Sequence, residues 1–404
     1  MRLYSLYRRL YVDVTVLLGI SLTLLLAWIN GANNAGNVIG AAVGAKSISA
    51  KKALQLAFIF EIIGATVLGH YVSTTIMRGI IDPGQLGEDV LTTGVVVVAF
   101  SATIWMFIAT YLRVPLSITQ AVVGGIVGFG LATLGVSGVA WSVLALIVFS
   151  WPVTLILAVV LSILLYRLYT RVLLHAGNIR TLLLVFTTLL YVCVSTTLLV
   201  AANSIFSGTL LLPISLLVPI PISALYMSLL EKRLRGDYYE VRYTISRHLL
   251  LVSASLAAFS HGAHDVGASA GLLQVLVDRL TTSSSVEDSV SRVVLLVSGF
   301  TIALGMLNWG YRVLGTLAEK ITPLTPESGF TAQLSAAFTT LLVTRLGLPS
   351  STTLAITGAI IGVGLARSRE YVNIKTVTKV FATWTMSFPA TLLISLATST
   401  LILR

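Results

Sequence analysis

The chain has 404 residues, of which 56% are hydrophobic and only 10% are charged, and its formal net charge is +11. Soluble proteins carry about 25% charged residues, so this composition excludes a soluble enzyme, a disordered chain and a nucleic-acid-binding domain. Because about 20 apolar residues span a membrane, the sequence predicts an all-α polytopic membrane protein with roughly ten to twelve transmembrane helices.

The apolar runs that predict these helices are continuous rather than alternating, which argues against strands. In chain order they begin near Val14, Ala53, Val95, Ser117, Val143, Leu182, Leu210, Leu249, Val293, Ala332, Thr352 and Val377. Basic residues gather between the runs, as they do in the cytoplasmic loops of membrane proteins. The most charged loop covers residues 231–247, and we expect it on the cytoplasmic side.

Three motifs of the first half return in the second half, in the same order and at nearly constant separation. Asn30-Gly-Ala-Asn-Asn-Ala-Gly36 returns as His261-Gly-Ala-His-Asp-Val-Gly267, Pro115-Leu-Ser-Ile-Thr119 as Pro349-Ser-Ser-Thr-Thr353, and Trp151 as Trp384. The pattern predicts two homologous membrane repeats, residues 1–230 and 248–404, joined by the charged loop 231–247. Repeats with an odd number of crossings would be inverted relative to each other.

Both copies of the first motif combine polar side chains with glycine. Polar groups are costly inside a membrane helix and mark functional sites, and glycine weakens a helix. We therefore assign Gly31, Gly36, Gly262 and Gly267 to helix breaks near the bilayer midplane. A broken helix exposes N–H groups that suit an anion, and its free carbonyls suit a coupling cation. Outside these motifs, Gly124, Gly128, Gly358 and Gly362 form small-residue ridges, which we assign to helix packing.

The second motif places proline at or near the start of a helix, where its missing N–H costs little. Its hydroxyl residues then lie in the first helical turn, beside free backbone donors. If the four polar segments meet, they form a donor-rich cage for a tetrahedral oxyanion. Paired interruptions in two matching halves are typical of a transporter's central site.

These motifs resemble those of the inorganic phosphate transporter family, which also contains sulfate permeases. The resemblance runs from about Leu26 to Leu401 and includes the supporting stretches Phe60–Gly64, Trp309–Val313 and Gly329–Gln333. It implies an anion symporter of the cell membrane that is driven by sodium or protons, is built from inverted repeats and forms a homodimer.

The chain departs from the family pattern at several polar positions. Asn34 replaces an aspartate, His264 an asparagine and Gln333 a glutamate, while Gln120 and Leu354 replace histidines. Glu61 and Asp265 remain as the main carboxylates within the membrane. Fewer carboxylates weaken the case for several sodium sites.

We predict that the oxyanion binds to side chains from both halves. These are Asn33, Asn34, Ser117, Thr119, Gln120, His264, Asp265, Ser351, Thr352 and Thr353. Asn30, Glu61 and Asp265 are predicted to engage the coupling cation. The expected partners are the anion, membrane lipid and a second copy of the chain; we expect no nucleic acid, and no cofactor beyond a sodium ion used for coupling.

Alternative functions remain open from the sequence alone. Hydrogen phosphate carries a proton and benefits from an acceptor such as Asp265. Sulfate has no proton and prefers a site made only of donors, and Asn34 shifts the site in that direction. The overall motif pattern favours phosphate. A passive anion channel fits the cage nearly as well as a symporter. A membrane hydrolase using Ser260, His264 and Asp265 leaves the repeat unexplained, and a zinc site of His261, His264 and Asp265 lacks a fourth ligand.

Overall fold

The computed structural model describes residues 2–202, 210–280, 291–314 and 321–403, which form an all-helical protein. Within these ranges the isolated β-bridge is a single contact between Ile81 and Val139. The first half contains α1 (Arg2–Gly44), α2 (Ala50–Leu68), α3 (His70–Arg78), α4 (Glu88–Tyr111), α5 (Ile118–Thr133) and α6 (Trp141–His175). Next come α7 (Ile179–Ala202), α8 (Leu211–Leu217) and α9 (Pro219–Glu231). The second half contains α10 (Tyr238–Leu280), α11 (Arg292–Trp309), α12 (Pro326–Arg345), α13 (Thr352–Arg367) and α14 (Ile374–Ile402).

Seven helices of the described chain are long and apolar enough to cross a membrane, or eight if the bent pair α2–α3 forms one span. The polytopic all-α fold is therefore confirmed. The count is lower than the predicted ten to twelve for two reasons. The helices α5 and α13 are short, and α10 and α12 carry many buried polar residues that lower their hydropathy.

The predicted helix breaks at the glycine-rich motifs are wrong, because α1 and α10 run unbroken through them. A break does occur elsewhere, between α2 and α3 at Gly69, where the axis bends by 60°. The motif glycines instead leave room, because they have no side chain, for the backbone of a neighbouring helix to pack closely. A Cβ added to Gly31 would lie 1.8 Å from the Ile302 carbonyl oxygen of α11, and one added to Gly262 would lie 2.1 Å from the Glu61 carbonyl oxygen of α2.

These close approaches are reciprocal. Gly305 of α11 faces the Trp28 carbonyl of α1, and Gly64 of α2 faces the Phe259 carbonyl of α10. The pair α1–α11 thus repeats the pair α2–α10, with one helix of each pair drawn from each half. The two halves are interleaved rather than placed side by side.

The ridge glycines confirm the same arrangement at a second place. A Cβ on Gly124 or Gly128 of α5 would meet backbone oxygens of α14, and one on Gly358 or Gly362 of α13 would meet backbone oxygens of α6. Their assignment to packing is therefore correct. Each short helix packs against a long helix of the opposite half.

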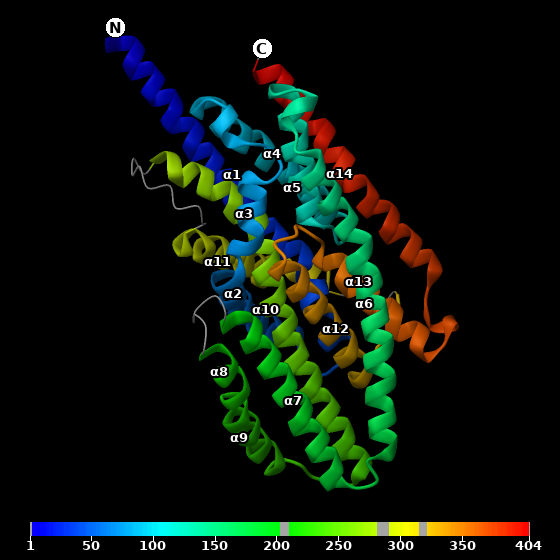
Figure 1. Cartoon of the computed structure of the whole chain (residues 1–404). Helices are drawn as coiled ribbons and strands as arrows, with labels where there is room; N and C mark the ends of the chain where they lie inside the picture. Colours follow the sequence, from blue (N-terminus) through cyan, green and yellow to red (C-terminus); the bar gives the residue numbers. More distant parts are fainter. Residues whose placement is uncertain (1, 203–209, 281–290, 315–320, 404) are drawn as a thin grey trace.

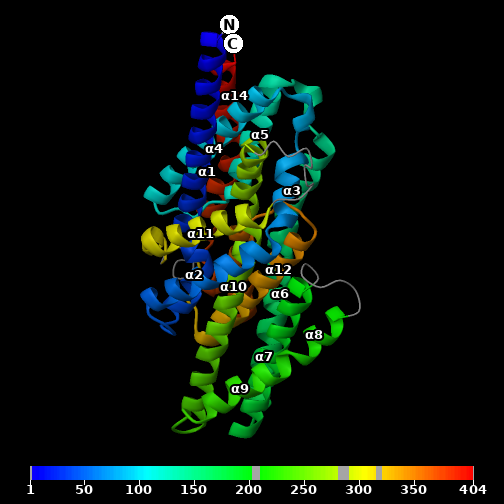
Figure 2. The same cartoon turned by 90° about the vertical axis from the view of Figure 1, so that its left-hand side faces the viewer.

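Equivalent helices run in opposite directions. In both views α1 starts at the end where the two termini lie and runs away from it, whereas α10 runs toward that end (Figures 1 and 2). The long helices α6 and α14 are opposed in the same way (Figure 1). The repeats are thus inverted, as predicted. The helices α7, α8 and α9 lie at the opposite end of the molecule, with α7 against α10 and with both α8 and α9 packed on α7 (Figure 1).

Candidate functional site

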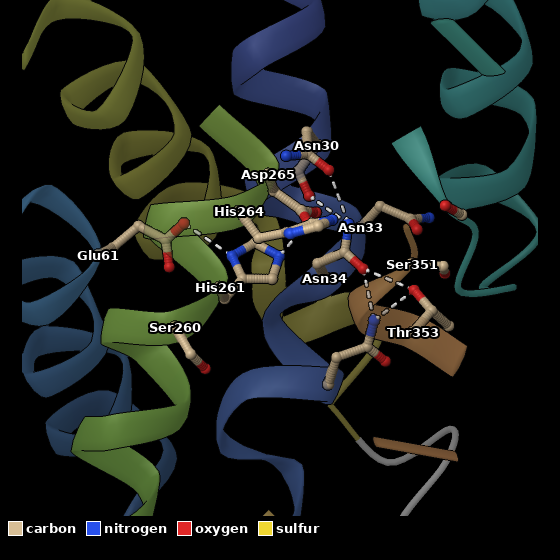
Figure 3. A network of polar contacts seen from close by, with 12 residues as sticks. Asn30, Asn33, Asn34, Glu61, Ser260, His261, His264, Asp265, Ser351 and Thr353 are labelled. Atoms are coloured by element: carbon tan, nitrogen blue, oxygen red, sulfur yellow. Dashed lines mark hydrogen bonds and ion pairs between the residues drawn. The ribbon is translucent and has the colours of Figure 1, made fainter. Parts of the chain in front are cut away.

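The four polar segments meet at the centre of the protein, where α1 and α10 cross and α2 and α13 approach (Figure 3). Every predicted site residue is buried, with at most 8% of its surface exposed. Such a concentration of buried polar groups is costly unless the groups have partners. The hydrogen bonds therefore show which side chains hold neighbouring segments in place and which keep polar atoms without a partner.

Asn33 holds the segment before α5, which we call the Pro115 loop (residues 112–117). Its side-chain nitrogen donates to Thr110 Oγ1 and to the Val114 carbonyl, each at 2.9 Å. Its side-chain oxygen accepts from the Leu116 backbone N–H at 2.7 Å. Two of the bonds go to the loop and the third to the end of α4, so Asn33 fixes the loop against α4 rather than presenting free atoms.

His264 occupies the equivalent position near the segment before α13, the Pro349 loop (residues 346–351). Its Nδ1 lies 2.8 Å from Thr344 Oγ1, and that hydroxyl donates to the Thr340 carbonyl. Nδ1 must therefore carry the proton. His264 Nε2 has no hydrogen-bond partner among the described residues.

The two loops have matching backbone turns. Arg113 and Gly347 both adopt left-handed conformations, with φ of 58° and 65°. Each loop is also held by the other half, because Trp384 Nε1 of α14 donates to the Pro115 carbonyl and Trp151 Nε1 of α6 donates to the Pro349 carbonyl, both at 3.2 Å. The repeated tryptophans therefore anchor the loops across the repeat boundary.

Asn34 is the centre of an amide network that joins α1 to α13. Its nitrogen donates to Asn30 Oδ1 at 2.7 Å and to the Asn30 carbonyl at 3.2 Å. Its oxygen accepts from Asn37 Nδ2 and from Thr353 Oγ1, the latter at 3.1 Å. The Thr353 hydroxyl also lies 3.0 Å from the Leu116 carbonyl of the Pro115 loop, so this network brings the two halves into direct contact.

Glu61, His261 and Asp265 form a buried acid–base chain on the α10 side (Figure 3). His261 Nδ1 lies 2.7 Å from Glu61 Oε1, and His261 Nε2 lies 3.1 Å from Asp265 Oδ2. Glu61 Oε2 and Asp265 Oδ1 have no hydrogen-bond partner in the described part of the chain. His261 was absent from the predicted site; its spacing of four residues from Asp265, which places both on one helix face, was the available signal.

The remaining predicted residues lie at the helix starts. Ser117 and Ser351 cap α5 and α13 by accepting from the backbone N–H groups of Gln120 and Leu354. Thr119 and Gln120 are buried in the first turn of α5, and the side-chain oxygen of Gln120 has no partner among the described residues.

The cavity at this place is small. It has a volume of about 20 Å³ and is lined by Asn37, Ser260, His261, Thr340 and Thr352, together with apolar side chains. That is room for about one water molecule and too little for an oxyanion with five heavy atoms. Among the described residues, no three His, Cys, Asp or Glu side chains surround a common metal position.

Comparisons with known proteins agree on one family. Residues 30–395 match a family described as the phosphate transporter family. The chain is 35% identical over 399 residues to a Pyrococcus abyssi protein provisionally named a phosphate permease, covering 95% of this chain and 96% of that protein. It is 30% identical over 408 residues to the chloroplastic inorganic phosphate transporter 2-1 of Arabidopsis thaliana, covering 90% of this chain and 68% of that protein.

A solved structure described as the sodium-dependent phosphate transporter has the same fold. It matches with a TM-score of 0.89 and 29% sequence identity, and the match covers 96% of this chain and 99% of the other.

Proposed function

Because this chain belongs to the phosphate transporter family, we propose that it is a secondary active transporter that carries inorganic phosphate across the membrane together with sodium. Family membership makes it a multi-pass membrane transporter rather than an enzyme. Phosphate as the substrate is supported by the names of its relatives, and sodium by the name of the matching structure.

The phosphate site is proposed at the starts of α5 and α13. The first backbone N–H groups of a helix lack intrahelical partners and attract anions. In both helices the capping serine satisfies only the third N–H group, that of Gln120 or Leu354. The hydroxyls of Thr119 and Thr352 stand in the same turns and add donors, whereas the Thr353 hydroxyl is already bonded to Asn34. Asn33 and His264 position the two loops.

Phosphate rather than sulfate is supported by the carboxylate that remains beside these donors. Hydrogen phosphate has a proton to donate, and Asp265 Oδ1 is buried without a partner among the described residues. Sulfate at neutral pH has no such proton and would face the negative carboxylate directly. Asp265 therefore favours the protonated anion.

Phosphate cannot enter without a rearrangement. The central cavity of about 20 Å³ is too small for the anion, so the helices around it would have to separate on at least one side. Alternating opening on the two sides of an inverted repeat is the usual transport cycle of such folds. The tryptophan anchors link each loop to the opposite half, so the loops would move with those helices.

The observation that carries the proposal is the meeting of two inverted copies of one polar motif in the membrane interior. Its test is uptake of labelled phosphate and labelled sulfate into proteoliposomes, with and without a sodium gradient. Phosphate accumulation against its gradient that needs sodium is expected. Downhill flux alone would indicate a channel, and sulfate uptake unaffected by excess phosphate would indicate a sulfate permease.

The variant Asp265→Asn provides the residue-level test. We expect it to abolish gradient-driven uptake while the protein stays folded, because it removes a buried charge from the site. Asp278→Asn makes the same chemical change in the same helix, where Asp278 contacts Gln274, and should transport normally. Normal uphill transport by Asp265→Asn would refute the site.

The finer organisation is also proposed. Residues 1–230 and 248–404 would be the membrane repeats, the loop 231–247 would face the cytoplasm, and two copies would form a homodimer in the lipid bilayer. Chemical crosslinking in native membranes tests the dimer, and labelling of a cysteine placed in the loop tests its side.

A further inference from the structure

An apolar groove lies between α1 and α4, which run side by side in both views (Figures 1 and 2). We call it the α1–α4 groove. Its volume of about 310 Å³ falls within the range of ligand pockets, about 300–1,000 Å³. All but the first of the following lining side chains are exposed, so the groove opens toward the surrounding lipid. They are Leu22, Leu25, Phe100, Ile104, Phe107 and Ile108.

One end of the α1–α4 groove is positively charged. The ring centroid of Phe107 lies 5.6 Å from that of Trp309, and the guanidinium carbon of Arg312 lies 4.8 Å from the Trp309 ring centroid. Among the described residues, Arg312 forms no ion pair. A second exposed cation, Arg113, follows the end of α4. The apolar groove therefore leads to a guanidinium group that is free to bind an anion.

Sequence and exposure place this end at the boundary of the membrane. The helix α4 is long and apolar enough to cross a bilayer, and a second candidate span ends at Arg312. Tyr111 and Tyr311 are 66% and 60% exposed, and tyrosine gathers where helices leave the hydrocarbon core. Arg312 is therefore expected at the level of the lipid headgroups, with the groove extending from it into the hydrocarbon.

The groove also contains a hydroxyl group that lacks a partner. Thr103 lines the groove between Phe100 and Phe107, and its side chain is only 6% exposed. Its Oγ1 has no hydrogen-bond partner in the described part of the chain. A buried hydroxyl without a partner is costly. The ester carbonyl that joins an acyl chain to a lipid headgroup can accept a hydrogen bond from it.

We propose that the α1–α4 groove binds an anionic membrane phospholipid. One acyl chain fills the groove, the ester lies beside Thr103, and the phosphate pairs with Arg312. A guanidinium group can donate two parallel hydrogen bonds to a phosphate. A zwitterionic lipid would bring its own ammonium group close to Arg312 and Arg113, so the site favours a lipid with net negative charge. The proposal does not depend on which anion the protein transports.

The headgroup preference is measured by native mass spectrometry of the purified full chain with phosphatidylglycerol or phosphatidylcholine. Phosphatidylglycerol should bind roughly five- to tenfold more tightly, and Arg312→Gln should remove that preference. Arg345→Gln is the matched control, because Arg345 is stacked in the same way on Tyr71, with its guanidinium carbon 4.6 Å from the ring centroid. Equal affinities in the wild type, or an unchanged preference in Arg312→Gln, would overturn the proposal.

The acyl-chain site is tested by filling the groove. Ile104→Trp should abolish the tight binding of phosphatidylglycerol, whereas Ile156→Trp makes the same change at an exposed position of α6 and should not. Thermal unfolding identifies any variant that does not fold, and Ile108→Trp then replaces Ile104→Trp. Tight lipid binding by a folded, groove-filled variant would overturn the proposal. So would a spontaneous disulfide between two copies of Ile104→Cys, because a second copy would then cover the groove.

Discussion

Substituting Gly262 by alanine should uncouple Glu61 from His261 without touching either side chain. The new Cβ would lie 2.1 Å from the Glu61 carbonyl oxygen and 2.8 Å from the carbonyl carbon. Both are backbone atoms, so no side-chain rotation relieves the overlap. Because non-bonded atoms settle near 3.5 Å, α2 and α10 must separate by about 1.4 Å.

That displacement is enough to break the buried bond. The distance of 2.7 Å between His261 Nδ1 and Glu61 Oε1 would grow beyond the range of a hydrogen bond. Hydrogen bonds to charged groups contribute about 1.5–3 kcal/mol. If that energy positions Glu61 for sodium, the sodium concentration for half-maximal uptake should rise roughly 10- to 150-fold. The overpacking should also lower stability by about 1–3 kcal/mol.

The assay is the sodium dependence of phosphate uptake, together with thermal unfolding. Gly31→Ala is the matched control, because its Cβ would lie 1.8 Å from the carbonyl oxygen of Ile302, a residue without a carboxylate. It should lower stability similarly and leave the sodium dependence unchanged. Gly87→Ala, with no atom within 4 Å of its Cβ, should change neither the stability nor the sodium dependence of uptake. Equal sodium effects of Gly262→Ala and Gly31→Ala would refute the reasoning.

Three further substitutions test the loops. Asn33→Ala removes two hydrogen bonds to the Pro115 loop and one to Thr110 of α4 and should raise the KM for phosphate roughly tenfold or more, with sodium binding at equilibrium unchanged; an unchanged KM would contradict its positioning role. Trp384→Phe removes one cross-half bond, worth about 1 kcal/mol, and should lower the uptake rate about fivefold, whereas full activity would show that the anchor is dispensable. Arg113→Gly relieves a left-handed conformation and should stabilise the protein by about 1 kcal/mol, seen as a higher unfolding temperature; a lower one would mean that the arginine makes contacts that outweigh the strain.

The fold class, the repeat and the family were predictable because each depends on local sequence. Long apolar runs predict membrane helices without tertiary information, and the returning motifs predict two related halves. The match over residues 30–395 confirms the family that those motifs indicated.

The helix breaks could not be predicted correctly, because a glycine that breaks a helix and a glycine that makes room for a neighbouring helix look alike in the sequence. At Gly31 and Gly262 it admits the backbone of another helix, and that helix comes from the opposite half of the chain. The contact between Glu61 and His261 was likewise hidden, since 200 residues separate them. Only the pairing of α2 with α10 brings the two side chains together.

The interleaving of the halves has a consequence for biosynthesis. The ridge of Gly124 and Gly128 on α5 reaches its partner only when Phe388 and Leu392 of α14 have been made. At 5–20 residues per second, the ribosome needs roughly 13 to 53 seconds to make the residues between Gly128 and Leu392. Through this interval α5 sits in the bilayer with its packing surface open to lipid or to insertion chaperones, so the final shape of the first half is fixed last, when the C-terminal helix arrives.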